Sequence, residues 1–471
     1  MTDALLVRNL ACLVSCDPNS SVYRDVDLLC EDGVVRSITP HDPEFQYTDA
    51  EVIDGRDLLV YPGLVNTHHH FFQALVRNQL ALDWSRLSLV QWLERIYQIF
   101  TLINEDCIYH ASLVSLAELA KHGCTTAFDH QYCFNRHAGT QLIDRQFDAA
   151  AQVGLRLVAG RGTNTLPRSQ GSTMPDEMLE TTEVFLKDCE RLIKRYHDAA
   201  PHAMTNVVVA PCQPVNCLED TFIEGMALAR SHGVRLHTHL SEGENELMQA
   251  RWGQRSLDWC LEREIAGGDV WFAHCWEMSE DELRRMGETS TGLSHCPAAM
   301  CLVGDGITDL AAAHAFGVPI GLGVDGQASN DNSNLMECIR LAYLLQCLGA
   351  SSRNYPLPEA HRFLNFATTG GAQLLGRSEL GQLAPGSAAD FFAVDRRGVD
   401  FAATLHDPAL LPVKTGISGP VDLTVVAGRV VWRDGAFSHI DEEAVTMAAN
   451  RVYNDVIFKS PVLSTTGVSP T

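Results

Sequence analysis

Eight short apolar runs recur through the middle of the chain, and longer segments with helix-spaced apolar positions separate them. The runs cover residues 60–66, 125–129, 155–159, 206–210, 234–240, 270–274, 291–295 and 318–324. Strands that alternate with helices form parallel sheets, and eight such units are what a (β/α)8 barrel requires. A barrel of this kind takes about 250 residues. The chain has 471, so we expect a second, smaller unit beside the barrel.

Short strand-like segments lie at both ends of the chain. They cover residues 5–7, 26–30, 34–38 and 58–61 near the start, and 391–394, 423–426 and 430–432 near the end. Asp32-Gly33 and Ala427-Gly428 are suited to tight turns between such strands. Neither group is large enough to hold a core alone. We therefore predict an α/β fold in which a TIM-type (β/α)8 barrel, residues 59–379, is flanked by a small β-sandwich built from both termini, residues 1–58 and 380–471.

Histidines and aspartates gather where the predicted barrel strands end. The residues at these positions are His68, His70, Asp129, His130, His237, His239, His274, His295 and Asp325. Barrel enzymes carry their chemistry at the C-terminal ends of the strands. Structural histidines would instead fall anywhere along a strand, so the pattern indicates an active site.

The same residues match the ligands of a catalytic metal. Such a site needs about three nitrogen or oxygen ligands and an open position for water. His68 and His70 are two apart in an extended segment, so they share a face. The set is completed by the carboxylate of Asp325 and by one further histidine, either His237 or His239. Spacing alone does not choose between these two histidines.

Glu242 follows the predicted strand that carries His239, where a carboxyl group is suited to proton transfer. The alternative is an ordinary exposed loop acid, because Glu244 and Glu246 stand beside it.

Charge and cysteine content limit the partners and the compartment. The chain carries 35 basic and 59 acidic residues, a formal net charge of -24 at pH 7. This charge repels nucleic acid and anionic membrane surfaces, so we expect a small neutral substrate. The 15 cysteines contain no CxxC pair, and no stretch resembles a leader or a membrane span. We expect a reducing, cytoplasmic compartment.

Five motifs resemble, in order, those of the amidohydrolase superfamily. They are Asn66-Thr67-His68-His69-His70, Leu236-His237-Thr238-His239-Leu240-Ser241-Glu242, Ala273-His274-Cys275, Ser294-His295-Cys296-Pro297 and Gly321-Leu322-Gly323-Val324-Asp325-Gly326. Further passages, such as Lys121-His122-Gly123-Cys124-Thr125 and Ser418-Gly419-Pro420-Val421-Asp422, are similar to the branch of aminohydrolases that act on nitrogen heteroaromatic rings.

This resemblance implies a role for each candidate residue. One divalent ion, zinc with iron as the alternative, would be held by His68, His70, His239 and Asp325. His237 then becomes a supporting or structural residue. The predicted catalytic residues are Glu242 as proton carrier, His274 as a partner of hydroxide or substrate, and Asp325 as acceptor of the proton from water. Gln73 and His295 would line the substrate pocket by analogy, and a homodimer is expected on the same ground.

The implied reaction removes an exocyclic amino or alkylamino group from an N-heteroaromatic ring by addition of hydroxide. The expected substrate is hydroxyatrazine, which would lose ethylamine; the alternative is 8-oxoguanine or a pterin, which would release ammonia. After His-Cys-Pro many relatives continue with a small residue, Ser and Asn, whereas this chain has Ala298-Ala299-Met300. A less polar pocket at Met300, with Trp84 as a further wall, favours the alkylamino substrate. An alternative from a different functional class is a barrel that has lost catalysis and serves as a scaffold.

Overall fold

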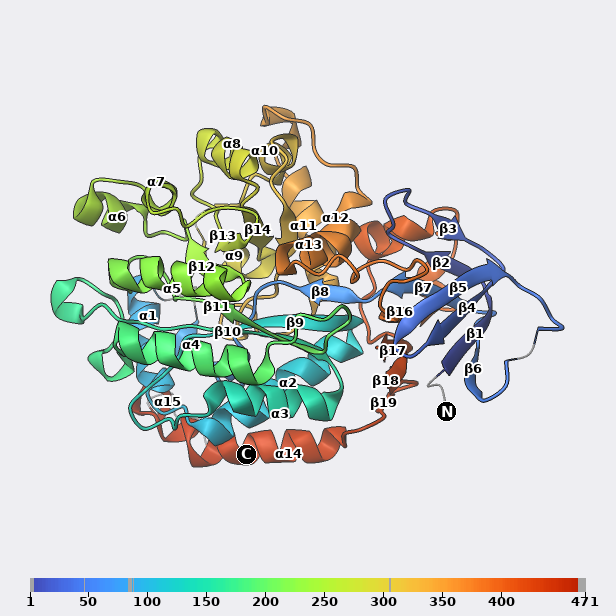
Figure 1. Ribbon diagram of the computed structural model, residues 1–471, viewed down its shortest axis with the longest axis horizontal. Helices are drawn as coiled ribbons and strands as arrows, with labels where there is room; N and C mark the ends of the chain where they lie inside the picture. The colour runs from blue at the N-terminus through green and yellow to red at the C-terminus, as the bar shows by residue number, and fades with distance from the viewer. Residues whose placement is uncertain (1–3, 46, 84–86, 88, 305, 465–471) are drawn as a thin grey trace.

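The computed structural model describes residues 4–45, 47–83, 87, 89–304 and 306–464. Its centre is an eight-stranded parallel sheet in which each strand pairs with the next along the chain (Figure 1). The strands are β8 (Leu64–Asn66), β9 (Cys124–Gln131), β10 (Arg156–Arg161), β11 (Thr205–Val209), β12 (Leu236–Leu240), β13 (Val270–His274), β14 (Gly292–His295) and β15 (Ile320–Leu322). The amide of Thr67, just after β8, donates to the Leu322 carbonyl of β15 at 3.0 Å. This contact brings the first and last strands together, and the predicted barrel is confirmed.

Helices cover the outside of this sheet (Figure 1). They are α1 (Leu89–Phe100), α2 (Glu105–Lys121), α3 (Leu142–Val153), α4 (Thr182–Tyr196), α5 (Glu219–His232), α6 (Asn245–Trp252), α7 (Ser256–Glu262), α8 (Glu280–Thr289), α9 (Pro297–Val303), α10 (Leu310–Ala315), α11 (Leu335–Cys347), α12 (Arg362–Asn365) and α13 (Gly371–Leu375). Their ends follow local chemistry: the Asn104 side chain accepts from the Cys107 amide at the start of α2, and Ser279 and Glu282 form a capping box on α8. None of the helices in the described part of the chain is long and apolar enough to cross a membrane.

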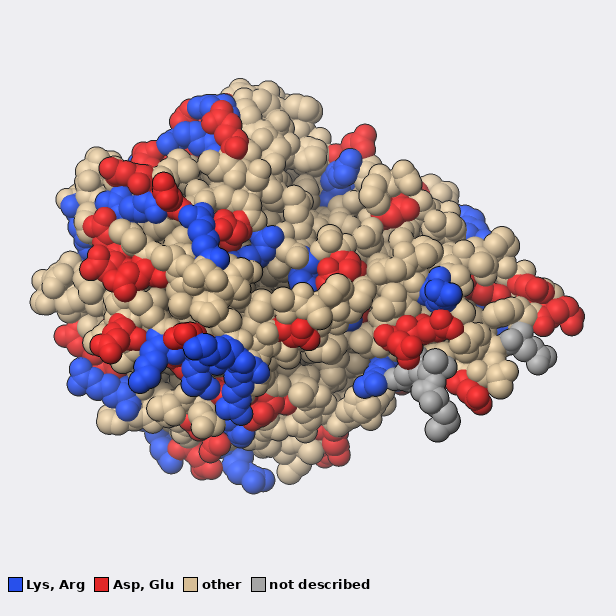
Figure 2. All heavy atoms as spheres, viewed as in Figure 1, with Lys and Arg blue, Asp and Glu red and all other residues tan. Residues whose placement is uncertain are grey.

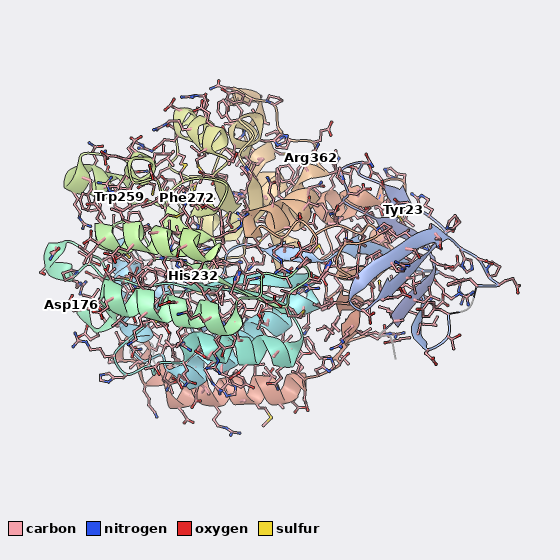
Figure 3. The ribbon with its side chains drawn as sticks, in the orientation of Figure 1. Tyr23, Asp176, His232, Trp259, Phe272 and Arg362 are labelled. Atoms are coloured by element: carbon pink, nitrogen blue, oxygen red, sulfur yellow. The ribbon has the colours of Figure 1, made fainter. Side chains whose placement is uncertain are left out.

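Large side chains fill the space between the strands and this helical layer. Phe272 of β13 and Trp259 of α7 are both fully buried, and Trp259 packs edge-on against Phe222 of α5 with ring centroids 5.3 Å apart (Figure 3). Burial of an apolar side chain of this size stabilises the fold by about 1.5–3 kcal/mol. These contacts hold the strands, and therefore the strand ends, in fixed positions.

Two further sheets form the sandwich, which lies at the right of Figure 1. The four-stranded sheet has the order β5 (Val34–Pro40), β4 (Val26–Glu31), β1 (Ala4–Leu10), β6 (Ala50–Asp54). The seven-stranded sheet has the order β19 (Ala436–Phe437), β18 (Arg429–Arg433), β17 (Leu423–Val426), β16 (Phe391–Asp395), β7 (Leu58–Pro62), β2 (Cys12–Val14), β3 (Val22–Tyr23). Leu5, Val60 and Phe391 belong to its common buried core. Both ends of the chain therefore contribute to it, as predicted.

The chain passes from sandwich to barrel at Gly63. The single strand expected over residues 60–66 is two strands, since β7 pairs with β16 in the sandwich and β8 pairs with β9 in the barrel. A Cβ atom on Gly63 would lie 2.1 Å from Oγ1 of Thr125, so no larger residue fits this crossing. The sequence alone shows one apolar run here because both strands are buried. The division of the chain into units at residues 58 and 380 stays a prediction.

The C-terminal segment returns to the barrel. Helix α14 (Glu442–Asp455) lies along α2 at the bottom of Figure 1, where Nζ of Lys121 contacts Glu442 at 2.6 Å. The short helix α15 (Pro461–Ser464) follows it. A buried ion pair also joins the barrel to the sandwich, because Arg156 of β10 donates to both carboxylate oxygens of Asp390 at 2.6 and 3.0 Å.

Side chains of α13 close one end of the barrel. Ala372 and Leu374 pack in one buried cluster with Val65, Phe128 and Trp271 from the strands. The opposite end, at the left of Figure 1, carries the predicted site residues beside α1 and α6.

Candidate metal centre

Three imidazoles converge at the open end of the barrel. Nε2 of His70 lies 3.1 Å from Nε2 of His239, and the ring nitrogens of His68, His70 and His239 form one cluster with separations under 4.8 Å. His68 and His70 follow β8, and His239 lies within β12. All three side chains are buried.

The other nitrogen of each ring has a partner that fixes where the hydrogen lies. Nδ1 of His70 donates to the His130 carbonyl at 2.8 Å, and Nδ1 of His239 donates to the Cys212 carbonyl at 2.7 Å. A carbonyl oxygen only accepts, so in the neutral rings both Nε2 atoms are bare.

The tautomer of His68 is set through His237. Nδ1 of His237 donates to the Trp271 carbonyl at 3.0 Å, which leaves its Nε2 to accept from Nδ1 of His68 at 2.9 Å. Burial lowers the pKa of His68 to about 4, despite a contact with Asp325, so the ring is neutral at pH 7. Nε2 of His68 is therefore also bare, and it has no hydrogen-bond partner among the described residues.

Asp325 brings the fourth ligand atom to the same point. Its Oδ1 lies 3.2 Å from Nε2 of His68 and 3.3 Å from Nε2 of His70, and its Oδ2 accepts from Ser329 at 2.7 Å. Burial acts to raise the pKa of Asp325, but the neighbouring His68 and His70 hold it well below its ordinary value. The carboxylate is thus ionised.

These atoms fit a divalent cation. Three bare nitrogens and a carboxylate oxygen repel one another unless a positive charge lies between them. An ion with bonds of about 2.0–2.1 Å in tetrahedral geometry separates its ligand atoms by about 3.3 Å. The separations of 3.1 Å between His70 and His239, 3.2 Å between His68 and Asp325, and 3.3 Å between His70 and Asp325 agree with that spacing. A second cluster, His68, His130 and His237, fits less well, because His130 directs Nε2 at the Ala210 carbonyl and His68 Nδ1 already donates to His237.

Glu242 and His274 lie beside this cluster. Nε2 of His274 is 3.3 Å from Oε1 of Glu242, and the two residues form a common group with His239. Burial, Asp325 and Glu244 raise the pKa of Glu242 well above its ordinary value. Burial also lowers the pKa of His274 to about 3. A protonated carboxyl group and a neutral imidazole suit proton transfer at neutral pH.

The backbone that carries these groups has unusual geometry. Asp325 has φ +62°, His274 has φ +71° and Ser241 has φ +52°. Non-glycine residues adopt this left-handed region rarely, and such residues cluster at functional sites. His274 ends β13, Ser241 directly follows β12 and Asp325 lies three residues after β15, so all three belong to turns at the same end of the barrel.

A cavity above the metal position is bounded by His70, His239, Glu242, His274 and Asp325. Among the predicted substrate residues, Gln73 lines it and accepts from the Ala328 amide at 3.1 Å. His295 and Met300 are not among the described residues that line it. Both are buried, and Met300 lies behind His274, where its sulfur contacts Thr308 at 3.4 Å and Thr308 donates to the His274 carbonyl.

The binding roles of His295 and Met300 stay predictions. Trp84 lies outside the described residues.

Loop and helix residues that the sequence did not indicate form most of the cavity wall. Its aromatic members are Tyr97 of α1 and Tyr132 after β9. Trp92 of α1, which the sequence offers with Trp84 as a candidate wall residue, lines the cavity as well. Its polar members include Gln213 and Asn216 after β11. Only the fold brings α1 and these loops together, so no motif or spacing marks them. Glu244, which stood in the sequence as a neighbour in an exposed loop, is buried and faces the same cavity.

The surface carries no continuous basic patch on the face shown in Figure 2, where acidic and basic side chains are interspersed. Basic residues of α4 pair with acids: Arg191 contacts Asp144 and Asp188, and Lys194 contacts Glu190. All 15 cysteines lie in the described part of the chain and none is in a disulfide; 13 are buried.

Comparison with known proteins places these features in a family. Residues 59–431 match the model of the amidohydrolase family. The chain is 53% identical to hydroxydechloroatrazine ethylaminohydrolase of Pseudomonas sp. (strain ADP) over 469 residues, which is 97% of this chain and 98% of the relative. It is 36% identical to 8-oxoguanine deaminase of Pseudomonas aeruginosa, over 89% of this chain and 92% of the relative.

Comparison with solved structures supports the same family. The atrazine chlorohydrolase of Arthrobacter aurescens TC1 complexed with zinc superposes with a TM-score of 0.90 at 27% identity, over 95% of this chain and all of the other. The matching family model, the near full-length relatives and the shared architecture show that the chain belongs to the amidohydrolase family.

Proposed function

We propose that this protein is a metal-dependent aminohydrolase that removes an alkylamino group from an N-heteroaromatic ring, with hydroxyatrazine as substrate and ethylamine as product. The observation that carries the proposal is the convergence of three bare imidazole nitrogens and the Asp325 carboxylate beside Glu242, whose Oε1 lies 3.3 Å from Nε2 of His274. The 53% identity to a hydroxydechloroatrazine ethylaminohydrolase over nearly the whole chain supports the choice of substrate.

The metal ligands in this proposal are His68, His70, His239 and Asp325. A divalent ion, zinc by our proposal with iron as the alternative, would supply a water whose pKa falls toward about 7. Asp325, whose Oδ1 lies 3.2 Å from Nε2 of His68 and 3.3 Å from Nε2 of His70, would accept the proton that the attacking water gives up. His274 orients the reacting groups from the opposite side of Glu242.

Glu242 moves the second proton. Its protonated carboxyl donates to a ring nitrogen, which makes the carbon that bears the amine electrophilic. Glu242 is then reprotonated with the proton that Asp325 took from water, and it delivers this proton to the amine as the bond between the ring carbon and the amine breaks. The added hydroxyl group finally loses its proton to Glu242, which restores the acid. Burial and the negative charges of Asp325 and Glu244 raise the pKa of Glu242 well above its ordinary value, which favours the protonated form that this step requires.

The mouth of the cavity supports an alkyl-bearing substrate. Leu93 of α1, Val215 after β11 and Leu247 of α6 line it, and Leu247 keeps 45% of its surface exposed. Apolar side chains at this position favour a ring that carries an N-alkyl group over a purine with several hydrogen-bonding edges. The second candidate function, deamination of 8-oxoguanine or a pterin with release of ammonia, is favoured by the 36% identity to 8-oxoguanine deaminase.

A substrate panel separates the two functions. Purified protein loaded with zinc is incubated with hydroxyatrazine, 8-oxoguanine and isoxanthopterin, and ethylamine and ammonia are measured. Our proposal predicts ethylamine from hydroxyatrazine with the largest kcat/KM of the panel. A larger kcat/KM for ammonia release from 8-oxoguanine or isoxanthopterin would favour the second function. Metal-loaded protein that releases neither amine would contradict both.

The proposal also includes the cellular compartment and the oligomeric state of the protein. The free, mostly buried thiols support a reducing cytoplasm. The family resemblance predicts a homodimer, which light scattering of the purified protein tests.

A further inference from the structure

A buried carboxylate that the proposed reaction does not use lies two residues after Glu242. Glu244 is only 4% exposed, although it belongs to a loop between β12 and α6. Its Oε1 accepts from the Ser241 amide at 2.5 Å and from the Ser256 hydroxyl at 2.6 Å. Its Oε2 accepts from the Glu242 amide at 2.6 Å and from Nε2 of Gln213 at 3.3 Å. Both oxygens are thus engaged by the loop that carries the predicted proton carrier.

The arrangement requires both side-chain oxygens of Glu244, Oε1 and Oε2, to act as hydrogen-bond acceptors. A backbone N–H can only donate, and one such group faces each carboxyl oxygen of Glu244. A glutamine of the same shape would turn its NH2 group toward one of these amides. One buried N–H would then lose its partner, which destabilises this conformation of the loop.

The loop needs this support because its backbone is unusual. Ser241 has φ +52° and Gly243 has φ +104°. A second acid, Glu277, holds the outer side of the same loop, since its Oε2 accepts from the amides of Gly243 and Asn245 at 2.9 and 3.3 Å. Between these two anchors the side chain of Glu242 extends to within 3.3 Å of His274.

We infer that Glu244 is a positioning residue for the reaction: its carboxylate holds the Ser241 and Glu242 amides and so fixes the Glu242 carboxyl at the metal centre. This inference rests on the proposed function for Glu242. In the described part of the chain the carboxylate of Glu244 is hydrogen-bonded to Ser241, Glu242, Ser256 and Gln213 and to none of the predicted metal ligands, so its effect passes through the loop. A change at Glu244 should therefore lower kcat and leave substrate binding and metal content almost unchanged.

The test compares E244Q with E246Q, a matched change at an exposed residue of the same segment. For E244Q we expect kcat for amine release to fall at least tenfold, with KM within twofold and metal per chain equal to that of the wild type. Hydrogen exchange should become faster at the amides of Ser241 and Glu242. E246Q should behave as the wild type in every measurement. S256A removes one donor to the carboxylate, keeps the charge, and should lower kcat by a smaller factor.

The outcomes separate this inference from the proposed function. Wild-type protein without amine release would contradict the function, and the exchange of the two amides would still test the loop contact. E244Q with kcat within twofold of the wild type, or with unchanged exchange at both amides, would overturn the inference. If E244Q does not fold, S256A decides: kcat equal to the wild type would overturn it.

Discussion

In the candidate metal centre, hydrogen bonds determine which ring nitrogen of each histidine is left free to bind an ion. His70 and His239 each direct Nδ1 at a backbone carbonyl, and His68 directs Nδ1 at His237. These contacts leave one bare nitrogen per ring, and those of His68 and His70 lie 3.2 and 3.3 Å from Oδ1 of Asp325. Residues that orient metal ligands in this way are worth a factor of about 10–100 in metal affinity.

The His237→Ala substitution tests this role. We expect the affinity for zinc to fall by about 10–100-fold, because Nδ1 of His68 loses its acceptor and the ring is free to turn. Competition with a chromophoric zinc chelator measures the change. His232→Gln, on the exposed end of α5, is the matched control and should bind zinc as the wild type does. Unchanged affinity in the His237 variant would refute the supporting role.

Glu242→Gln tests the proton carrier. The glutamine cannot deliver a proton, so we expect kcat to fall by about 10²–10⁴-fold while the metal content stays at the wild-type value. Turnover near that of the wild type with bound metal would assign the acid to another residue.

The raised pKa of Glu242 also predicts a pH dependence. The protonated form is the active one in the proposed reaction, so activity is present below the pKa of Glu242 and is lost as pH rises through it. The alkaline limb of the kcat/KM profile should therefore lie above the ordinary range of a carboxyl group. The residual activity of Glu242→Gln should lack this limb. If the alkaline limb persists in Glu242→Gln, it arises from another titratable group, which would contradict its assignment to Glu242.

At the scale of strands and helices, the position of the site follows from strand order. The barrel strands could be predicted where a short apolar run has a polar residue at its end, as in β13. A sandwich strand over residues 58–61 and a barrel strand over residues 60–66 were also predicted, but the break between them at Gly63 was not, because both sides of it are apolar and only the pairing partners differ. The return of α14 to α2 depends on tertiary contacts, and no local pattern encodes it.

The candidate site likewise contains residues that could be predicted from the sequence and residues that could not. Residues at strand ends, such as His68, His239 and Asp325, were predictable because the barrel brings all strand ends to one rim. Their assignment as ligands remains a proposal. Trp92 and Gln213 reach the cavity from a helix and a loop whose placement depends on the whole fold. Glu244 was missed because an acid among other acids in a loop gives no sign of burial.

The ion pair between β10 and the start of β16 yields a prediction for element packing. Both Arg156 and Asp390 are about 1% exposed, and Asp390 also accepts from the Ala427 amide at 2.8 Å. Asp390→Asn leaves the buried guanidinium uncompensated, so we expect the free energy of unfolding to fall by about 3–5 kcal/mol. Urea denaturation followed by circular dichroism measures it.

The exposed pair of Asp395 with Arg397 provides the control for this change. Asp395→Asn should alter the free energy of unfolding by no more than about 1 kcal/mol. Equal effects of the two substitutions would show that burial does not govern the contribution of the Arg156 pair.

For the whole molecule, the metal links the barrel strands to one another. Its proposed ligands follow or belong to β8, β12 and β15, which are far apart in the sequence. A ligand that binds only the folded state stabilises it by about 2.7 kcal/mol at a free concentration 100 times its Kd. Chelation should therefore abolish turnover and lower the melting temperature, and added zinc should restore both. A melting temperature unaffected by chelation, with metal removal verified, would contradict this coupling.

The central claim is that His68, His70, His239 and Asp325 bind one divalent ion. Anomalous diffraction from crystals of the metal-loaded protein, measured on both sides of the zinc absorption edge, tests it most directly. We predict one strong peak per chain within bonding distance, about 2.0–2.2 Å, of the three Nε2 atoms and Oδ1 of Asp325. A peak at His130 and His237 instead, or no peak at this end of the barrel, would contradict the account.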